Sequence, residues 1–173
     1  KEHPWKFNDN TKEDKSIFPA DFSYYVLDKE DDGVINNIAQ QIANLAKRNN
    51  IVEDIDKIYL VNSFIFGRFV YESDEISKRC TEYPRYPIEL LMEGQGDCED
   101  AAILVAAILK ALYDKREINQ KIAFLYIPPK IKGEGGHSAL GITCNAMSQT
   151  NLVKVGAYCY FETTLMDKQC RKE

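Results

Sequence analysis

The stretch GQGDCEDAAILVAAILKALY, residues 94–113, decides the fold. Its second half is apolar at almost every position, and a helix that is hydrophobic on all sides must be buried. We therefore expect a central helix. Asp97 and Asp100 stand three residues apart, in the pattern of a capping box that starts a helix. Cys98 is thereby placed at the N-terminal mouth of the buried helix, behind two glycines.

Upstream of this stretch, the apolar residues recur at helical spacing in two segments. The first segment starts at about residue 32, with its stripe at Val34, Ile35, Ile38, Ile42 and Leu45. The second runs from about 53 to 71, with its stripe at Ile55, Ile58, Tyr59, Val61, Ile65 and Phe69. The following segment, 81–96, holds two Tyr-Pro steps and then Gly94 and Gly96. It predicts a largely irregular chain until the glycines are reached.

Downstream of the buried helix, the period changes to that of strands. KIAFLYIPP (121–129), HSALGITC (137–144) and VGAYCYFETT (155–164) predict three strands, and KIKGEGG (130–136) predicts a turn or a lid-like loop between the first two. Helices followed by an antiparallel meander define an α+β domain, with the buried helix packed on the sheet.

Composition limits the class of protein. The chain has 173 residues, which is enough for one domain: we expect an arm over 1–20 and a folded body over 21–173. The net charge of −5 argues against binding to nucleic acid. No apolar run is long enough to cross a membrane, so we expect membrane association only through an anchor upstream of Lys1. Such an anchored or extracytoplasmic domain is slightly favoured over a cytoplasmic one, and the oligomeric state is not predicted.

The cysteines and histidines predict neither a metal nor a cofactor. There are five cysteines with no zinc-type spacing, and two histidines. The four cysteines apart from Cys98 are expected to be structural or incidental, and two of them, Cys144 and Cys159, lie on neighbouring predicted strands and could pair.

Three residues could together perform nucleophilic chemistry. A nucleophilic Cys98 needs a base and a group that orients the base. His137 is the one histidine in the predicted body and starts a strand, and Glu162 is the acid of the last predicted strand. The structural alternatives are a buried core cysteine, a histidine satisfied in a turn, and a solvated acid at a sheet edge.

Four segments resemble motifs of the transglutaminase-like superfamily, which has a papain-like fold, and above all its microbial (archaeal and bacterial) branch of cysteine proteases. They are YPRYPIELL (83–91), GQGDCEDAAIL (94–104), GGHSALGI (135–142) and YFETT (160–164). The resemblance covers about residues 50–165, and the helical IYLVNSFIFGRFVYESD (58–74) is similar to the family's lead-in helix. Glu162 stands where many relatives have aspartate.

The resemblance implies a Cys-His-Glu triad that attacks amide or peptide bonds of a protein or peptide substrate through an acyl-enzyme thioester. Cys98 would attack, with its helix N-terminus favouring the thiolate. His137 would take the thiol proton, and Glu162 would orient the imidazole. The backbone N–H of Cys98 would bind the oxyanion, with Gln95 or Tyr86 as a second donor.

Three functions remain open from the sequence. The first is a thiol-dependent hydrolase, a protease or amidase. The second is a protein-glutamine acyltransferase, a transglutaminase with the same triad. The third is a binding module that kept the fold without the activity. Tyr83, Arg85 and Tyr86 could line a substrate groove or pack in the body.

Overall fold

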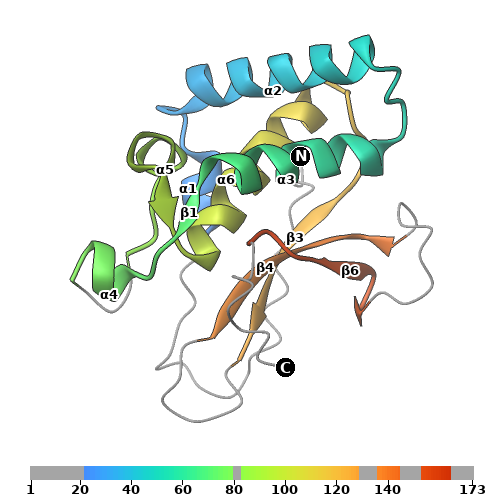
Figure 1. Ribbon diagram of the computed structural model, residues 1–173. Helices are drawn as coiled ribbons and strands as arrows, with labels where there is room; N and C mark the ends of the chain where they lie inside the picture. Colours follow the sequence, from blue (N-terminus) through green and yellow to red (C-terminus); the bar gives the residue numbers. More distant parts are fainter. Residues whose placement is uncertain (1–21, 80–82, 129–135, 145–152, 165–173) are drawn as a thin grey trace, which may run out of the picture.

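The computed structural model describes residues 22–79, 83–128, 136–144 and 153–164. The predicted arm, 1–20, and most of the glycine-rich loop, 129–135, lie outside the described residues. Helices dominate the described chain up to residue 114, and an antiparallel sheet follows them (Figure 1). The predicted α+β class is therefore confirmed.

The helices are α1 Ser23–Leu27, α2 Asp32–Arg48, α3 Asp54–Arg68, α4 Asp74–Ser77, α5 Pro87–Glu93 and α6 Cys98–Asp114. The helix predicted from about residue 32 is confirmed as α2, but its predicted buried stripe is only partly right, because Val34 and Leu45 are exposed. The second predicted helix is wrong at its end: α3 stops at Arg68, because Phe69 takes extended backbone angles and the chain enters a short strand. None of the helices among the described residues has the length and apolar content needed to cross a bilayer.

The prediction that residues 81–96 are largely irregular is wrong, because the described part of this segment contains α5. Pro87 occupies the first turn, where its fixed φ suits a helix, and Glu89 completes a capping box with Tyr86. Gly94 ends the helix with a left-handed φ of 72°. These start and stop signals were present in the sequence, but the Tyr-Pro steps suggested an extended chain.

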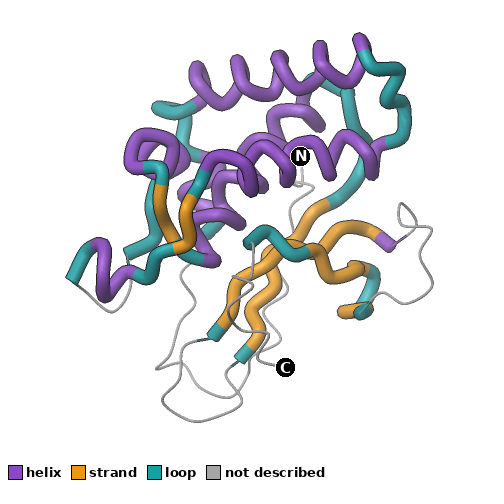
Figure 2. Tube along the Cα trace, viewed as in Figure 1, coloured by secondary structure: helices purple, strands orange, loops and turns teal. Residues whose placement is uncertain are grey.

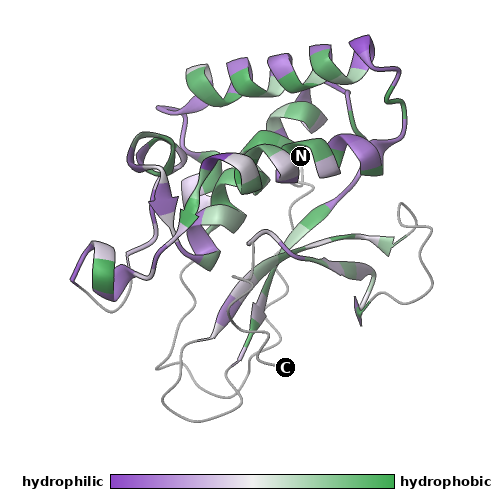
Figure 3. Ribbon diagram, viewed as in Figure 1, coloured by the Kyte–Doolittle hydropathy of each residue, from purple (hydrophilic) through white to green (hydrophobic). Residues whose placement is uncertain are grey.

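Helix α6 is the centre of the fold. It contacts α1, α2, α3, α5 and strand β4, so it lies between the helical layer and the sheet (Figures 1 and 2). Every residue from Ala101 to Leu109 is buried, in agreement with the apolar run (Figure 3). Burial on all sides fixes the position of the helix, and with it the position of Cys98 at its first residue.

The strands are β1 Val70–Tyr71, β2 Gln95–Gly96, β3 Ile122–Ile127, β4 His137–Thr143, β5 Lys154–Val155 and β6 Tyr158–Phe161. β1 and β2 form a parallel pair, and the others form an antiparallel sheet in the order β3-β4-β6-β5. The last predicted strand is split, because Gly156 adopts a left-handed φ of 60° and turns the chain between β5 and β6. Leu140 of β4 pairs with Phe161 of β6, which brings the start of β4 to the end of β6.

A disulfide joins Cys144 and Cys159 at the other end of this β4–β6 pair. Cys98 is the free cysteine among the described residues, and Cys80 and Cys170 lie outside them.

Candidate active site

The mouth of α6 is built by a reciprocal capping box. The Asp97 side chain accepts from the backbone of Asp100, and the Asp100 carboxylate accepts from the Asp97 N–H at 3.2 Å. Both acids thus serve the helix terminus, as the sequence indicated. Cys98 occupies the first helical position and is only 6% exposed.

A fully buried arginine fixes the capping carboxylate in place. Arg85 donates its backbone N–H to Asp100 at 2.7 Å and contacts the same carboxylate with its guanidinium at 2.5 Å. It also binds Asp74 at 2.8 Å. Arg85 has no exposed surface, so it does not line a substrate groove. The sequence suggested that Arg85 lies near the site, but it did not show that Arg85 holds the carboxylate that caps α6.

His137 and Glu162 meet at one end of the β4–β6 pair. The imidazole Nε2 lies 3.0 Å from Glu162 Oε2 and 3.3 Å from Oε1. The Thr163 and Thr164 N–H groups each donate to Glu162 Oε1 at 2.9 Å, the Thr164 hydroxyl donates to it at 2.7 Å, and the Tyr160 hydroxyl donates to Oε2.

This dense set of donors sets the charge of Glu162. Burial by itself raises the pKa of the carboxyl, but the hydrogen bonds from His137, Tyr160 and Thr164 outweigh it and lower the pKa from 4.5 to about 2. Glu162 is therefore an acceptor that stays ionised, and a neutral His137 must carry its proton on Nε2. The other ring nitrogen, Nδ1, is then left with its lone pair.

The same strand reaches the thiol. The backbone N–H of Ser138, the residue after His137, donates to Cys98 Sγ at 3.3 Å. Cys98, His137 and Glu162 come from a helix start, a strand start and a strand end that are far apart in the chain, and the fold gathers them at one place. Among the described residues, Sγ has no hydrogen bond to the imidazole; it donates instead to Glu99 Oε2 at 3.3 Å.

The thiol environment differs from the expected one. Burial and the negative charge of Glu99 raise the pKa of the Cys98 thiol well above its usual range, with Asp97 adding to the effect. The Ser138 N–H acts in the opposite direction but does not overcome them. The expectation that the helix N-terminus favours a thiolate is therefore not met: burial first, and then the carboxylates beside the helix terminus, keep the resting thiol protonated.

The residues suggested for the second oxyanion donor are engaged elsewhere. Gln95 donates its amide to Glu72 Oε2 at 2.6 Å. Tyr86 packs its ring against Tyr25, with centroids 4.8 Å apart, and against Tyr24. In contrast, the Cys98 N–H has no hydrogen-bond partner among the described residues, as expected in a first helical turn.

Three carboxylates near the thiol could hold a cation. One oxygen each of Asp74, Asp97 and Glu99 lies within 4.8 Å of the others. Asp74 is already bound by Arg85 and by the Tyr83 N–H, so its oxygens serve the buried ion network first. We assign no chemistry to this group.

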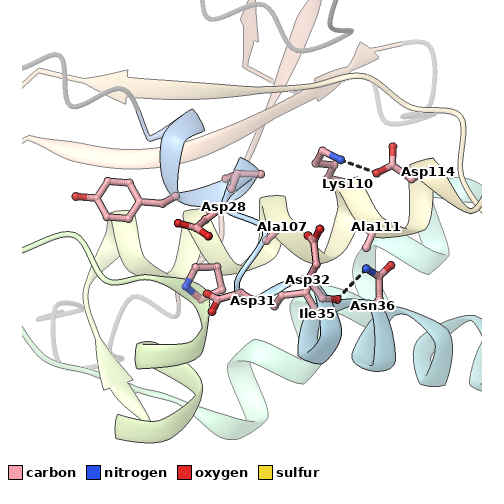
Figure 4. A pocket seen from close by; sticks show the side chains of 12 residues that line it. Asp28, Asp31, Asp32, Ile35, Asn36, Ala107, Lys110, Ala111 and Asp114 are labelled. Carbon is pink, nitrogen blue, oxygen red and sulfur yellow. Dashed lines mark hydrogen bonds and ion pairs between the residues drawn. The ribbon is translucent and has the colours of Figure 1, made fainter.

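A separate pocket lies between α1, α2 and α6 (Figure 4). Two pairs of its labelled polar groups interact within the wall: Lys110 pairs with Asp114 at 2.5 Å, and the Asn36 amide donates to the Asp32 carbonyl at 2.8 Å. Neither the thiol nor the imidazole is among its lining residues.

No family model matches the chain, and no curated protein matches it either. The site must therefore be interpreted from its geometry. Sequence reasoning missed the roles of Ser138 and Tyr160. Glu99 and Ser138 each adjoin a candidate catalytic residue in the chain, and Tyr160 lies on the same strand face as Glu162.

Proposed function

We propose that this chain is a thiol-dependent hydrolase of amide or peptide bonds, with Cys98 as nucleophile, His137 as base and Glu162 as the group that orients the base. One observation carries the proposal: Glu162 binds His137 Nε2 at 3.0 Å, and the next backbone N–H along β4 donates to Cys98 Sγ at 3.3 Å. A buried cysteine that only fills a core has no need of such an ordered pair beside it.

The raised thiol pKa determines how this site would react. A protonated Cys98 gives its proton to Nδ1 of His137 as sulfur attacks the carbonyl carbon, so the imidazole acts as a general base. This requires the thiol hydrogen to turn from Glu99 to the imidazole. The Ser138 N–H then supports the sulfur while it gains negative charge. The ionised Glu162 stabilises the imidazolium, which later protonates the leaving amine.

The arrangement also supports membership of the transglutaminase-like superfamily with its papain-like core. A cysteine at a buried helix start, a histidine at a strand start and an acid after the neighbouring strand occur here in the order and places that the resemblance implies. The substrate would be a protein or peptide. The disulfide between β4 and β6 favours an oxidising, extracytoplasmic location.

The test uses p-nitrophenyl acetate, whose acyl group forms a thioester with a competent thiol. We expect the wild-type protein to be acetylated on Cys98, to release p-nitrophenolate repeatedly, and to transfer the acetyl group to water or to an added primary amine. Cys98→Ala and His137→Ala should lose this activity. Acetylation of Cys98 no faster than that of free N-acetylcysteine would overturn the proposal, because a thiol with a raised pKa needs base assistance to react.

A further inference from the structure

The proposed attack on a carbonyl creates an oxyanion, and one donor for it is evident. The free N–H of Cys98 can donate to that oxygen, but acyl-transfer sites generally use at least two donors. Among nearby side chains, Gln95 is bound to Glu72, and the Tyr160 hydroxyl is bound to Glu162. A second donor must come from another element near the mouth of α6.

The parallel β1–β2 pair brings Tyr71 to this mouth. Tyr71 pairs with Gly96, which precedes Cys98 by two residues. A Cβ placed on Gly96 would meet Asp100 Oδ2 at 2.5 Å, so this face of the pair looks at the first turn of α6. Paired residues of a parallel ladder project from the same face, and the Tyr71 side chain therefore leaves β1 on the face that looks at that turn.

The Tyr71 hydroxyl is both available and protonated. Tyr71 is 53% exposed, and its hydroxyl has no hydrogen-bond partner among the described residues. Partial burial and the charges of Cys98, Asp97 and Glu99 raise the pKa of this phenol well above its usual value. The Tyr71 side chain leaves β1 beside the first turn of α6, and no hydrogen bond among the described residues joins its hydroxyl to the Cys98 sulfur. An oxyanion donor must occupy such a place, since the oxygen forms beside the sulfur.

We propose that Tyr71 is a catalytic residue that donates its hydroxyl hydrogen bond to the oxyanion formed when Cys98 attacks a carbonyl carbon, together with the Cys98 N–H. This inference rests on the proposed function. The Sγ–C bond forms as the carbonyl π electrons move to oxygen, and the thiol proton goes to His137. Collapse of the oxyanion then expels the leaving group; Tyr71 keeps its proton throughout.

The experiment compares two reactions of the same thiol in the full chain. Acetylation by p-nitrophenyl acetate passes through an oxyanion, whereas alkylation by iodoacetamide is a displacement at saturated carbon that forms none. We expect Tyr71→Phe to slow acetylation of Cys98 at least tenfold and to leave its alkylation rate within twofold of wild type. Tyr24→Phe is the matched control, because Tyr24 is 65% exposed and packs against Tyr86 instead.

The outcomes separate the two proposals. If wild-type Cys98 is acetylated no faster than a free thiol, the proposed function and this inference both fall. If wild type is active and Tyr71→Phe acetylates at the same rate, the function stands and the role of Tyr71 is refuted. If Tyr71→Phe slows both reactions equally, Tyr71 affects the thiol itself, and the oxyanion role is again refuted.

Discussion

Replacing Glu162 with glutamine tests the role of the acid with little change in shape. The amide oxygen of glutamine can still accept from the Thr163 and Thr164 N–H groups, which bind Glu162 Oε1 at 2.9 Å. The amide nitrogen then faces His137, and it can only donate. The imidazole Nε2 must therefore accept, and the neutral ring moves its proton to Nδ1.

This change of tautomer removes the base. A protonated Nδ1 cannot take the thiol proton of Cys98, so we expect Glu162→Gln to slow acetylation by p-nitrophenyl acetate about 10²- to 10⁴-fold, the usual range for a lost general base. Iodoacetamide alkylation at high pH should change less than acetylation does, because hydroxide from the solvent can then take the thiol proton in place of His137. A similar loss in both reactions would point to misfolding of the site instead.

The same substitution has a stability cost with a defined pH dependence. The pKa of Glu162 is lowered from 4.5 to about 2 in the folded chain, so its ionised form stabilises folding above the unfolded value, and this stabilisation is lost as the pH falls toward 2. At about 1.4 kcal/mol per pKa unit, the contribution at pH 7 is at most about 3.5 kcal/mol. We expect Glu162→Gln to be less stable than wild type at pH 7, with the difference shrinking between pH 5 and pH 2.

Two measurements test the predicted change of tautomer and the predicted loss of stability in Glu162→Gln. Because the chain has two histidines, a His3→Asn background leaves His137 as the single imidazole, and its ¹⁵N shifts report the tautomer directly. Urea unfolding at several pH values gives the stability difference, with the exposed Glu30→Gln as control. The reasoning is refuted if Nε2 keeps its proton in Glu162→Gln, or if the stability difference does not depend on pH.

Two further predictions follow from the site and the sheet. Glu99→Gln removes a charge that raises the pKa of the Cys98 thiol. Iodoacetamide alkylation at pH 7 should therefore accelerate about tenfold for each unit by which that pKa falls. An unchanged alkylation rate would contradict the role assigned to Glu99. The Cys144–Cys159 disulfide closes a separation of 15 residues. Its reduction should lower the free energy of unfolding by about 3 kcal/mol in urea titrations. Peptide mapping that finds both thiols free in the oxidised protein would rule the linkage out.

The sequence predicted the long elements because their patterns are strong. The helical stripe of α2 and the strands β3 and β4 were each visible in a window of a few residues. The short elements were missed for a local reason: α5 has seven residues, and two Tyr-Pro steps beside it favour an extended chain. The split of the last strand depended on the left-handed φ of Gly156, which its neighbours did not reveal.

For the candidate site too, the sequence predicted some features and the tertiary structure decided the others. The sequence nominated Cys98, His137 and Glu162 from their order and neighbours, and the register of β4 with β6 brings the histidine and the acid within 3.0 Å. The protonation state of the thiol could not be read from the sequence. It depends on how deeply Sγ is buried and on which side of it Glu99 lies.

By itself, the sequence determined that a buried helix with an apolar surface on all sides presents a cysteine at its capped N-terminus, because hydrophobic periodicity and capping are local properties of the chain. Tertiary structure alone decided the electrostatics around that cysteine. Desolvation, the buried Arg85 network and the approach of Ser138 and Tyr71 all involve residues distant in the chain, and their effects on charge depend on distances that only the packed fold sets.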